Sequence, residues 1–286
     1  MKKTDKLKAA LSALLTAAAL TSCGMTGDIE INGSERDDKS GTVTSVTAEP
    51  VAADVRNELS GECRGYGQGT ETDEKGRPLG ATGFNNMYKQ LDAYALREDT
   101  DKILLTFDQG YENGFTADIL DTLKEKKVKA VFFILQDYAE RNPELVQRMI
   151  DEGHIVANHS VHHYSMPTLS EEDCRREILD MHEYMQQNFG VEMDLFRPPM
   201  GEYSEKTLAV TKDCGYKTVM WSFAYADWDT ENQPDPNAAL KKMVDAAHPG
   251  AVYLLHSVSS TNAAVLGNMI DNIRDKGFEF EKLKNS

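Results

Sequence analysis

The chain has 286 residues, with 31 Lys and Arg against 47 Asp and Glu, which gives a formal net charge of -16. This charge excludes a nucleic acid as an expected partner, because a polyanion binds proteins through clustered Lys and Arg. Hydrophobic residues at 40% and charged residues at 27% are typical of a globular protein, and four cysteines are too few for a disulfide scaffold at this length.

The first 22 residues predict an export signal. A lysine-rich start precedes an apolar run from Ala9 to Leu20, which is shorter than the roughly 20 residues that a membrane-spanning helix needs. The next residues, Leu20-Thr21-Ser22-Cys23, resemble a bacterial lipobox, in which Cys23 carries the lipid. The alternative is a plain signal peptide with an incidental cysteine. We therefore expect an exported protein that is lipid-anchored to the outer face of the cytoplasmic membrane.

Composition divides the rest of the chain into three parts. Residues 23–60 are rich in Gly, Ser, Thr, Asp and Glu, which predicts a flexible acidic tether. Residues 61–100 mix glycine turns with aromatic residues, which indicates an ordered extension that packs on the main domain. Residues 101–286 alternate short apolar runs with stretches of helical periodicity, and they form the predicted main domain.

This alternation predicts an α/β fold. Strands are expected at 103–107, 130–135, 154–157, 195–196, 218–221, 251–255 and 278–280. Helices are expected around 119–123, from Pro143, from a cap at Ser170 to about 188, and at 205–214, 237–247 and 263–276. About seven strand–helix units favour a parallel sheet that closes, or nearly closes, into a distorted barrel.

Polar residues gather where the predicted strands end. The segments are Asp108-Gln109, His159 to His163, Arg197-Pro198, Asp227-Trp228 and His256. Because chemistry in such barrels lies at the carboxyl ends of the strands, we expect these segments to form one site.

The first three segments suggest a metal and a base. His159 and His163 are four residues apart, which would place both rings on one face of a helical turn beside a metal ion, or simply in solvent. Asp108 is a candidate general base or a helix cap. Arg197 can hold a carboxylate through a bidentate pair, or form a surface salt bridge.

The last two segments suggest an acid and a substrate wall. His256 is a candidate general acid or a hydrogen-bonded core histidine. Asp227 can orient and polarise that histidine, and Trp228 can offer an apolar wall to a sugar; the alternative for both is ordinary packing.

In this order and spacing the five segments resemble the NodB-type polysaccharide deacetylases, carbohydrate esterase family 4, over residues 102–283. Closer detail is similar to the muramic-delta-lactam deacetylases of spore-forming bacteria. The motifs that carry this likeness are TFDQGYENGFT (106–116), GRPLGATGFNNMY (76–88) and HPGAVYLLHSVSSTNA (248–263). The resemblance implies a distorted (β/α) barrel of about seven units.

The resemblance also implies roles for individual residues: Asp108 as catalytic base, His159 and His163 as metal ligands, Arg197 as the tether of the base, His256 as general acid and Asp227 as its partner. Tyr111, Pro198 and Trp228 are expected beside the substrate. The implied reaction is metal-assisted hydrolysis of N-acetyl groups on peptidoglycan amino sugars, with N-acetylmuramic acid as the expected sugar. The alternatives are a deacetylase or O-acetyl esterase of another exported polysaccharide, and a non-catalytic sugar-binding homologue.

One position departs from the family pattern. The family places a second aspartate, a metal ligand, where this chain has Gln109. A neutral amide oxygen binds a divalent ion less well than a carboxylate does, so we expect Gln109 to be a poor ligand and the metal to be weakly held. Zinc is the expected metal, with cobalt or manganese as alternatives.

Other enzyme classes lack their motifs in this chain. There is no G-x-S-x-G elbow of a serine hydrolase and no H-E-x-x-H of a zinc peptidase. With Cys23 lipidated, Cys63, Cys174 and Cys214 can form at most one disulfide, and free thiols are the favoured alternative. We expect a monomer.

Overall fold

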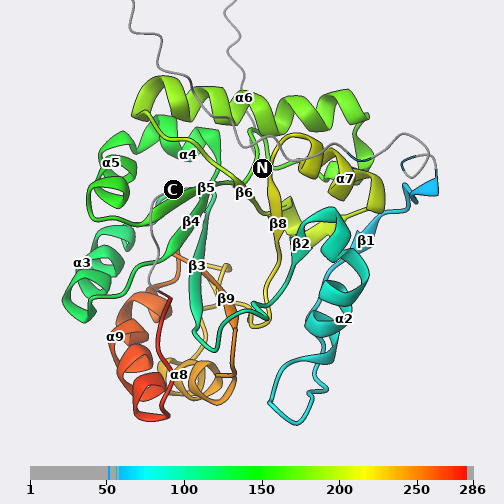
Figure 1. Ribbon diagram of the computed structural model, residues 1–286. Coiled ribbons are helices and arrows are strands. Elements are labelled where there is room, and N and C mark those ends of the chain that lie inside the picture. Colours follow the sequence, from blue (N-terminus) through cyan, green and yellow to red (C-terminus); the bar gives the residue numbers. More distant parts are fainter. Residues whose placement is uncertain (1–50, 52–55, 57, 282–286) are drawn as a thin grey trace, which may run out of the picture. The chain divides into compact units, whose positions relative to one another are not determined.

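Seven short parallel strands form the centre of the structure (Figure 1), which is a computed structural model that describes residues 51, 56 and 58–281. Their order across the sheet is β2 (Ala93–Tyr94), β8 (Lys217–Val219), β6 (Leu195–Phe196), β5 (Ile155–Asn158), β4 (Val131–Ile134), β3 (Leu104–Gln109) and β9 (Val252–His256). No ladder joins β9 to β2 among the described strands, so the sheet is a curled, incompletely closed barrel. This architecture confirms the predicted fold class.

Helices surround the outer side of this sheet (Figure 1). They are α3 (Thr116–Lys126), α4 (Gln136–Arg141), α5 (Pro143–Asp151), α6 (Glu171–Phe189), α7 (Glu205–Asp213), α8 (Pro236–Asp245) and α9 (Ser260–Asp275). Helix α2 (Leu79–Tyr88) packs beside β2, and β1 (Arg64–Gly65) forms an antiparallel ribbon with β7 (Glu202–Tyr203). Three 3-10 turns complete the described elements: Lys89–Leu91, Met166–Thr168 and Pro199–Gly201.

Local sequence explains several of these boundaries. Ser170 caps α6 by accepting the amide of Asp173 at 3.1 Å, as the sequence predicts. Pro143 occupies the first turn of α5, where its missing N–H costs nothing. Gly190 ends α6 in the left-handed region, at φ 67°.

Strand alternation divides the apolar residues between two layers. The outward-facing side chains of β3, β4 and β9 pack under the helices, with Phe107 stacked on Phe132 at 5.2 Å. The inward-facing side chains fill the barrel: Leu104, Val131, Phe133, Ala157, Val219 and Val252. Each fully buried Leu, Val or Phe side chain of this set contributes about 1.5–3 kcal/mol to stability. The same alternation places Asp108 on the inner face of β3, in line with Leu104.

The structure differs from the sequence expectation at five elements. Residues 278–280 form a single bridge between Phe280 and Ile103 rather than a strand, and β8 ends at Val219, two residues early. Helices α2 and α4 and strand β2 were not expected; β2 has only two residues, too few to show a period.

Several expectations concern residues outside the described part of the chain. These are the export signal at 1–22, the lipid on Cys23 and nearly all of the tether at 23–60. The division into extension and main domain stays a prediction, although β2 from the extension joins the central sheet. Within the described residues, no helix has the length and apolar character to cross a membrane. Cys63, Cys174 and Cys214 are free thiols, as the favoured alternative predicted.

Candidate active site

Asp108 and Arg197 form a buried pair inside the barrel. The Arg197 side chain is fully buried, and its Nη1 donates to Asp108 Oδ1 at 2.6 Å and to Thr106 Oγ1 at 2.9 Å. The pair is a single contact rather than the expected bidentate one, because the other donors of Arg197 bind carbonyls at the end of the neighbouring strand β8. Nε donates to Val219 O at 3.0 Å and Nη2 donates to Met220 O at 3.2 Å. Arg197 is thus fixed on three sides and presents one nitrogen to the carboxylate.

The charge state of Asp108 follows from this pairing. Burial would raise the pKa of Asp108, but the charge and hydrogen bond of Arg197, together with the neighbouring His159 and His256, outweigh it and keep the pKa below its usual value. The Arg197 guanidinium also lies 4.1 Å from the centre of the Phe133 ring. The carboxylate is therefore ionised at neutral pH, as a proton acceptor must be.

His159 is oriented by the backbone next to Arg197. Its Nδ1 lies 2.8 Å from Arg197 O, and because a carbonyl only accepts, Nδ1 carries the proton. Its Nε2 is left as a lone pair 3.6 Å from Asp108 Oδ2. Burial lowers the pKa of His159 to about 4, and burial also lowers the pKa of His163, so both rings are neutral metal-ligand candidates. The two ring centres are 5.1 Å apart.

The two histidines meet in a loop and not on a helical turn, so that part of the sequence prediction was wrong. Ser160 and His163 have φ of 80° and 60°, the left-handed region, which interrupts any helix. Side chains compensate for the missing backbone bonds: Asn158 Oδ1 accepts the Ser160 amide at 2.8 Å, and Ser160 Oγ accepts the His163 amide at 3.0 Å. The two rings still lie close together, as the four-residue spacing suggested. A loop, rather than a helical turn, brings them there.

Glu177 of α6 supports the same loop and was missed from the sequence. Its Oε2 accepts the amides of Val161 at 3.1 Å and His162 at 2.8 Å, and its Oε1 lies 2.6 Å from His162 Nδ1. The residue is 6% exposed, although it carries a charge. A signal existed, because Glu177 falls on the buried side of α6 next to Ile178, where a carboxylate needs a specific partner.

Gln109 lies on the other face of β3 from Asp108. Its side chain is fully buried, and Nε2 donates to Ser257 Oγ at 2.9 Å. Its Oε1 has no hydrogen-bond partner among the described residues. Gln109 therefore contacts Ser257, the residue after β9. It does not contact the loop of residues 159–163 that carries the two histidines, the histidine loop.

His256 and Asp227 form the second pair. Asp227 Oδ1 lies 2.7 Å from His256 Nδ1, and Asp227 Oδ2 accepts the His256 amide at 2.8 Å. Asn262 at the start of α9 donates to Asp227 Oδ2 at 2.6 Å and to His256 O at 3.1 Å, and it contacts the hydroxyl of Tyr225. Asn262 is a second supporting residue that the sequence did not reveal.

This network sets the protonation of His256. Burial would lower the pKa of His256, but the hydrogen bond and charge of Asp227 outweigh it and raise the pKa. With Nδ1 held by Asp227, Nε2 is the nitrogen free to give a proton. That direction suits a general acid.

A pocket of about 900 Å³ connects the two pairs, and its wall carries Asp108, His159, His163 and His256. Tyr111 and Trp228 line it with half or more of their surfaces exposed. The expected Pro198 is buried and does not line the pocket, whereas Met200 does. The wall residues that were not expected from the sequence include Gln68, Gly201 and Trp221.

The side chains of this pocket offer few ligands for a divalent metal. Within the described residues no group of three or more His, Cys, Asp or Glu side chains is suited to a metal ion. The two neutral imidazoles are suitable ligands, and zinc accepts such nitrogen donors with open positions. A metal here would be held by His159 and His163, with few protein ligands.

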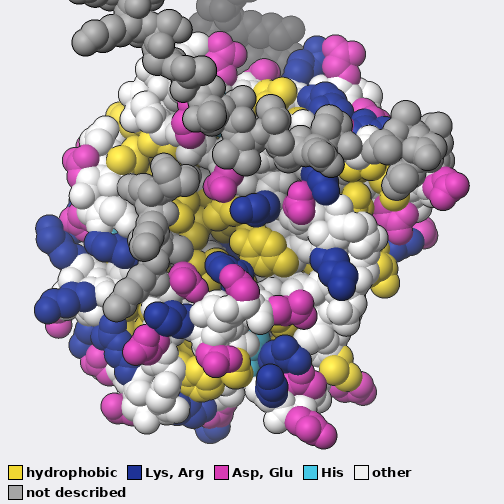
Figure 2. Space-filling model, in the orientation of Figure 1, with side chains coloured by type: hydrophobic (Ala, Val, Ile, Leu, Met, Phe, Trp, Pro, Cys, Tyr) yellow, Lys and Arg dark blue, Asp and Glu magenta, His cyan; other side chains and the backbone are white. Residues whose placement is uncertain are grey.

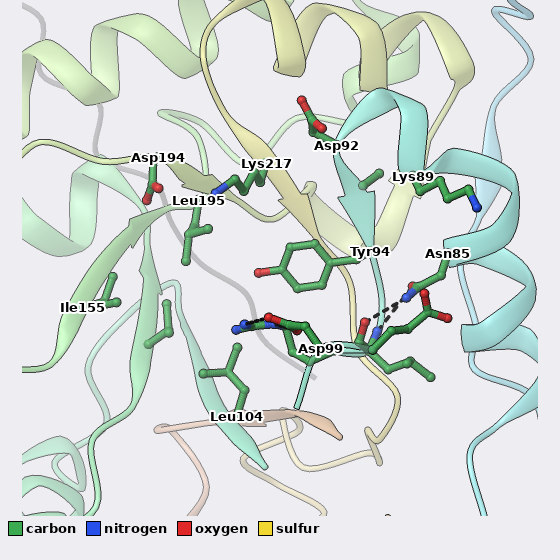
Figure 3. A pocket seen from close by; sticks show the side chains of 15 residues that line it. Asn85, Lys89, Asp92, Tyr94, Asp99, Leu104, Ile155, Asp194, Leu195 and Lys217 are labelled. Atoms are coloured by element: carbon green, nitrogen blue, oxygen red, sulfur yellow. Dashed lines mark hydrogen bonds and ion pairs between the residues drawn. The ribbon is translucent and has the colours of Figure 1, made fainter. Parts of the chain in front are cut away.

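A second pocket of about 510 Å³ lies at the opposite end of the strands (Figure 3). Its apolar lining comes from the first residues of β3, β4, β5 and β6, and the Tyr94 ring extends across it (Figure 3). None of the predicted catalytic residues is among its described lining. Positive and negative side chains are intermingled over the face shown in Figure 2 outside the grey atoms, so this face has no charge of a single sign.

The parallel half-barrel and the paired groups at its carboxyl-terminal strand ends define a barrel enzyme. A family model described as polysaccharide deacetylase matches residues 96–219. The peptidoglycan-N-acetylmuramic acid deacetylase PdaA of Bacillus subtilis is 40% identical over 70% of this chain and 77% of its own length. The chain belongs to the polysaccharide deacetylases, the family 4 carbohydrate esterases, and is a hydrolase of N-acetyl groups.

Solved structures agree with this assignment. The structure of B. subtilis PdaA, a family 4 carbohydrate esterase, superposes with a TM-score of 0.73 and 37% identity, over 78% of this chain and 95% of that one. A family 4 carbohydrate esterase from Bacillus anthracis gives a TM-score of 0.64 and 35% identity over the same shares. The family recognition made from the sequence motifs is confirmed.

Proposed function

We propose that this protein removes N-acetyl groups from the amino sugars of peptidoglycan, with N-acetylmuramic acid as the substrate sugar. The observation that carries the proposal is the buried Asp108–Arg197 pair, which shares one pocket with the His256–Asp227 pair. A sugar-binding protein needs neither an ionised buried base nor a histidine whose pKa is raised by a buried carboxylate. The similarity to PdaA, which its name describes as acting on N-acetylmuramic acid, supports the choice of sugar.

Each pair has one task in the proposed reaction. Asp108, kept ionised by Arg197, accepts the proton of the attacking water. His256, whose pKa Asp227 raises, donates its Nε2 proton to the nitrogen of the sugar as the amide bond breaks. The exposed rings of Tyr111 and Trp228 provide apolar surface for the sugar.

A divalent metal held by His159 and His163 would act as a Lewis acid and lower the pKa of water in the pocket. Such a metal is expected to bind weakly, with zinc as the first choice and cobalt or manganese as alternatives. Asp108 and His159 already face each other at 3.6 Å, so the base lies beside the ligand.

The test is acetate release and mass spectrometry of peptidoglycan fragments treated with the purified protein. Wild type should release acetate and leave one free amine on muramic acid, and Asp108→Asn should release at least about 100-fold less. Equal release by both proteins would contradict the role of Asp108. Deacetylation of glucosamine alone, or of a different polysaccharide, would contradict the substrate.

The proposed location is the cell surface. A peptidoglycan substrate requires an exported enzyme, and the predicted export signal with Cys23 as lipid carrier would keep it at the outer face of the membrane. Metabolic labelling with a fatty acid analogue should tag the wild-type protein and leave Cys23→Ala untagged.

A further inference from the structure

Trp221 forms part of the active-site wall and lies close to the catalytic pairs. It follows Val219 and Met220, whose carbonyls hold Arg197, and its ring lies 6.0 Å from the Arg197 guanidinium. The same indole lines the pocket that contains Asp108. Its placement therefore bears on both the pocket shape and the surroundings of the base.

Residues of the N-terminal extension hold this indole in place. Trp221 Nε1 donates to Gln68 Oε1 at 2.9 Å, and Gln68 Nε2 donates to Ala224 O at 3.3 Å. The Tyr66 hydroxyl donates to Trp221 O at 2.5 Å. The Tyr66 ring meets the indole edge-on, with centroids 5.1 Å apart and planes at 89°.

The outer edge of the six-membered ring of the indole lies against a glycine. Gly201 has φ 66°, and a Cβ added there would lie 2.6 Å from Trp221 Cη2. The amide of Tyr66 donates to Gly201 O at 2.9 Å, so the same segment fixes the glycine too. The contacts with Tyr66, Gln68 and Gly201 together hold the indole in this position.

We propose that Tyr66 and Gln68 are positioning residues for the active site, and that they act by fixing Trp221 as a wall of the substrate pocket. The inference rests on the proposed deacetylation. It assigns a part of the site to a segment that lies before the matched family region at 96–219. Neither residue touches the reacting groups, so substrate binding is the step that they affect.

The first test measures kinetics with soluble N-acetylated glycan strands of peptidoglycan. Gln68→Ala should raise KM about 2- to 10-fold, the effect of one neutral hydrogen bond, and change kcat less than about twofold. Gln90→Ala is the matched control, because Gln90 is an exposed glutamine of the same extension whose amide donates only to the nearby Met87 O. An unchanged KM, or an equal loss of kcat, would overturn the inference.

The second test needs no substrate. The chain has two tryptophans, so in a Trp228→Phe background the emission reports on Trp221 alone. Gln68→Ala should increase acrylamide quenching of this emission. Tyr66→Phe, a milder change, should also increase it. Unchanged quenching in both would overturn the inference. If wild type releases no acetate from the glycan, the proposed function fails, while the fluorescence result still judges the positioning of Trp221.

Discussion

Asp227 holds His256 at two points, through Oδ1 to the ring Nδ1 at 2.7 Å and through Oδ2 to the main-chain amide at 2.8 Å. The first contact fixes the tautomer of the ring, and the second holds the Asp227 carboxylate against the main chain at the end of β9. Because Asn262 donates to the same Oδ2, Asp227 cannot turn away from the histidine without losing several hydrogen bonds.

This relationship predicts a pH effect of Asp227→Asn. His256 must be protonated to act as an acid, so activity falls as pH rises through its pKa, which Asp227 raises. Removing the carboxylate charge should move this basic limb of the kcat/KM profile toward lower pH by about one to two units, since a charge-assisted hydrogen bond contributes about 1.5–3 kcal/mol. Asp245→Asn, on the exposed side of α8, should leave the profile in place. A basic limb that stays at the wild-type pH would refute the role of Asp227.

Glu177→Gln should weaken metal binding at His159 and His163. Both Glu177 oxygens accept hydrogen bonds from the loop, so a glutamine would turn its NH₂ group toward one of these donors. Supporting residues of this kind commonly change metal affinity about 10- to 100-fold, and we expect a loss near the lower value.

The measurement is zinc affinity by competition with a chromogenic chelator. Glu183→Gln is the matched control on the same helix, since Glu183 is exposed and accepts only from Gln187 four residues on. If Glu177→Gln binds zinc as tightly as wild type does, the histidine loop keeps its form without this carboxylate and the prediction is wrong.

Gln109→Met tests whether position 109 binds the metal. The Gln109 amide donates to Ser257, and its buried Oε1 has no partner among the described residues, so an apolar side chain of similar length loses one hydrogen bond and one unsatisfied oxygen. We expect zinc affinity within about twofold of wild type and a stability change below about 1 kcal/mol. His163→Ala, measured beside it, should abolish binding. A clear loss of affinity in Gln109→Met would identify Gln109 as a ligand.

The sequence predicted that the candidate catalytic groups share one site because they stand where strands end. Alternation along β3 places Asp108 toward the barrel interior, and the short apolar runs before His159, Arg197 and His256 mark the ends of β5, β6 and β9. These are local patterns, and parallel strands bring their ends together whatever lies between them.

The supporting residues could not be predicted in the same way. Glu177 and Asn262 lie on helices, and Gln68 meets Trp221 across a separation of 153 residues. Such contacts depend on how helices and the extension pack, which no local period encodes. The histidine loop shows the same limit, since hydrogen bonds from Asn158 and Glu177 replace the helical turn that the spacing suggested.

Gly201→Ala should cost more stability than Gly190→Ala, although the two glycines have nearly the same φ, 66° and 67°. A Cβ at Gly190 meets nothing within 4 Å, so this variant reports only the cost of the left-handed backbone, roughly 1–2 kcal/mol. At Gly201 the Cβ would lie 2.6 Å from Trp221, and overpacking should add about 1–3 kcal/mol. Urea unfolding of both variants measures the difference. Because the indole must move to admit the methyl group, Gly201→Ala should also raise KM, whereas Gly190→Ala should not. Equal losses of unfolding free energy would mean that Trp221 yields freely and that its position is not fixed by the glycine.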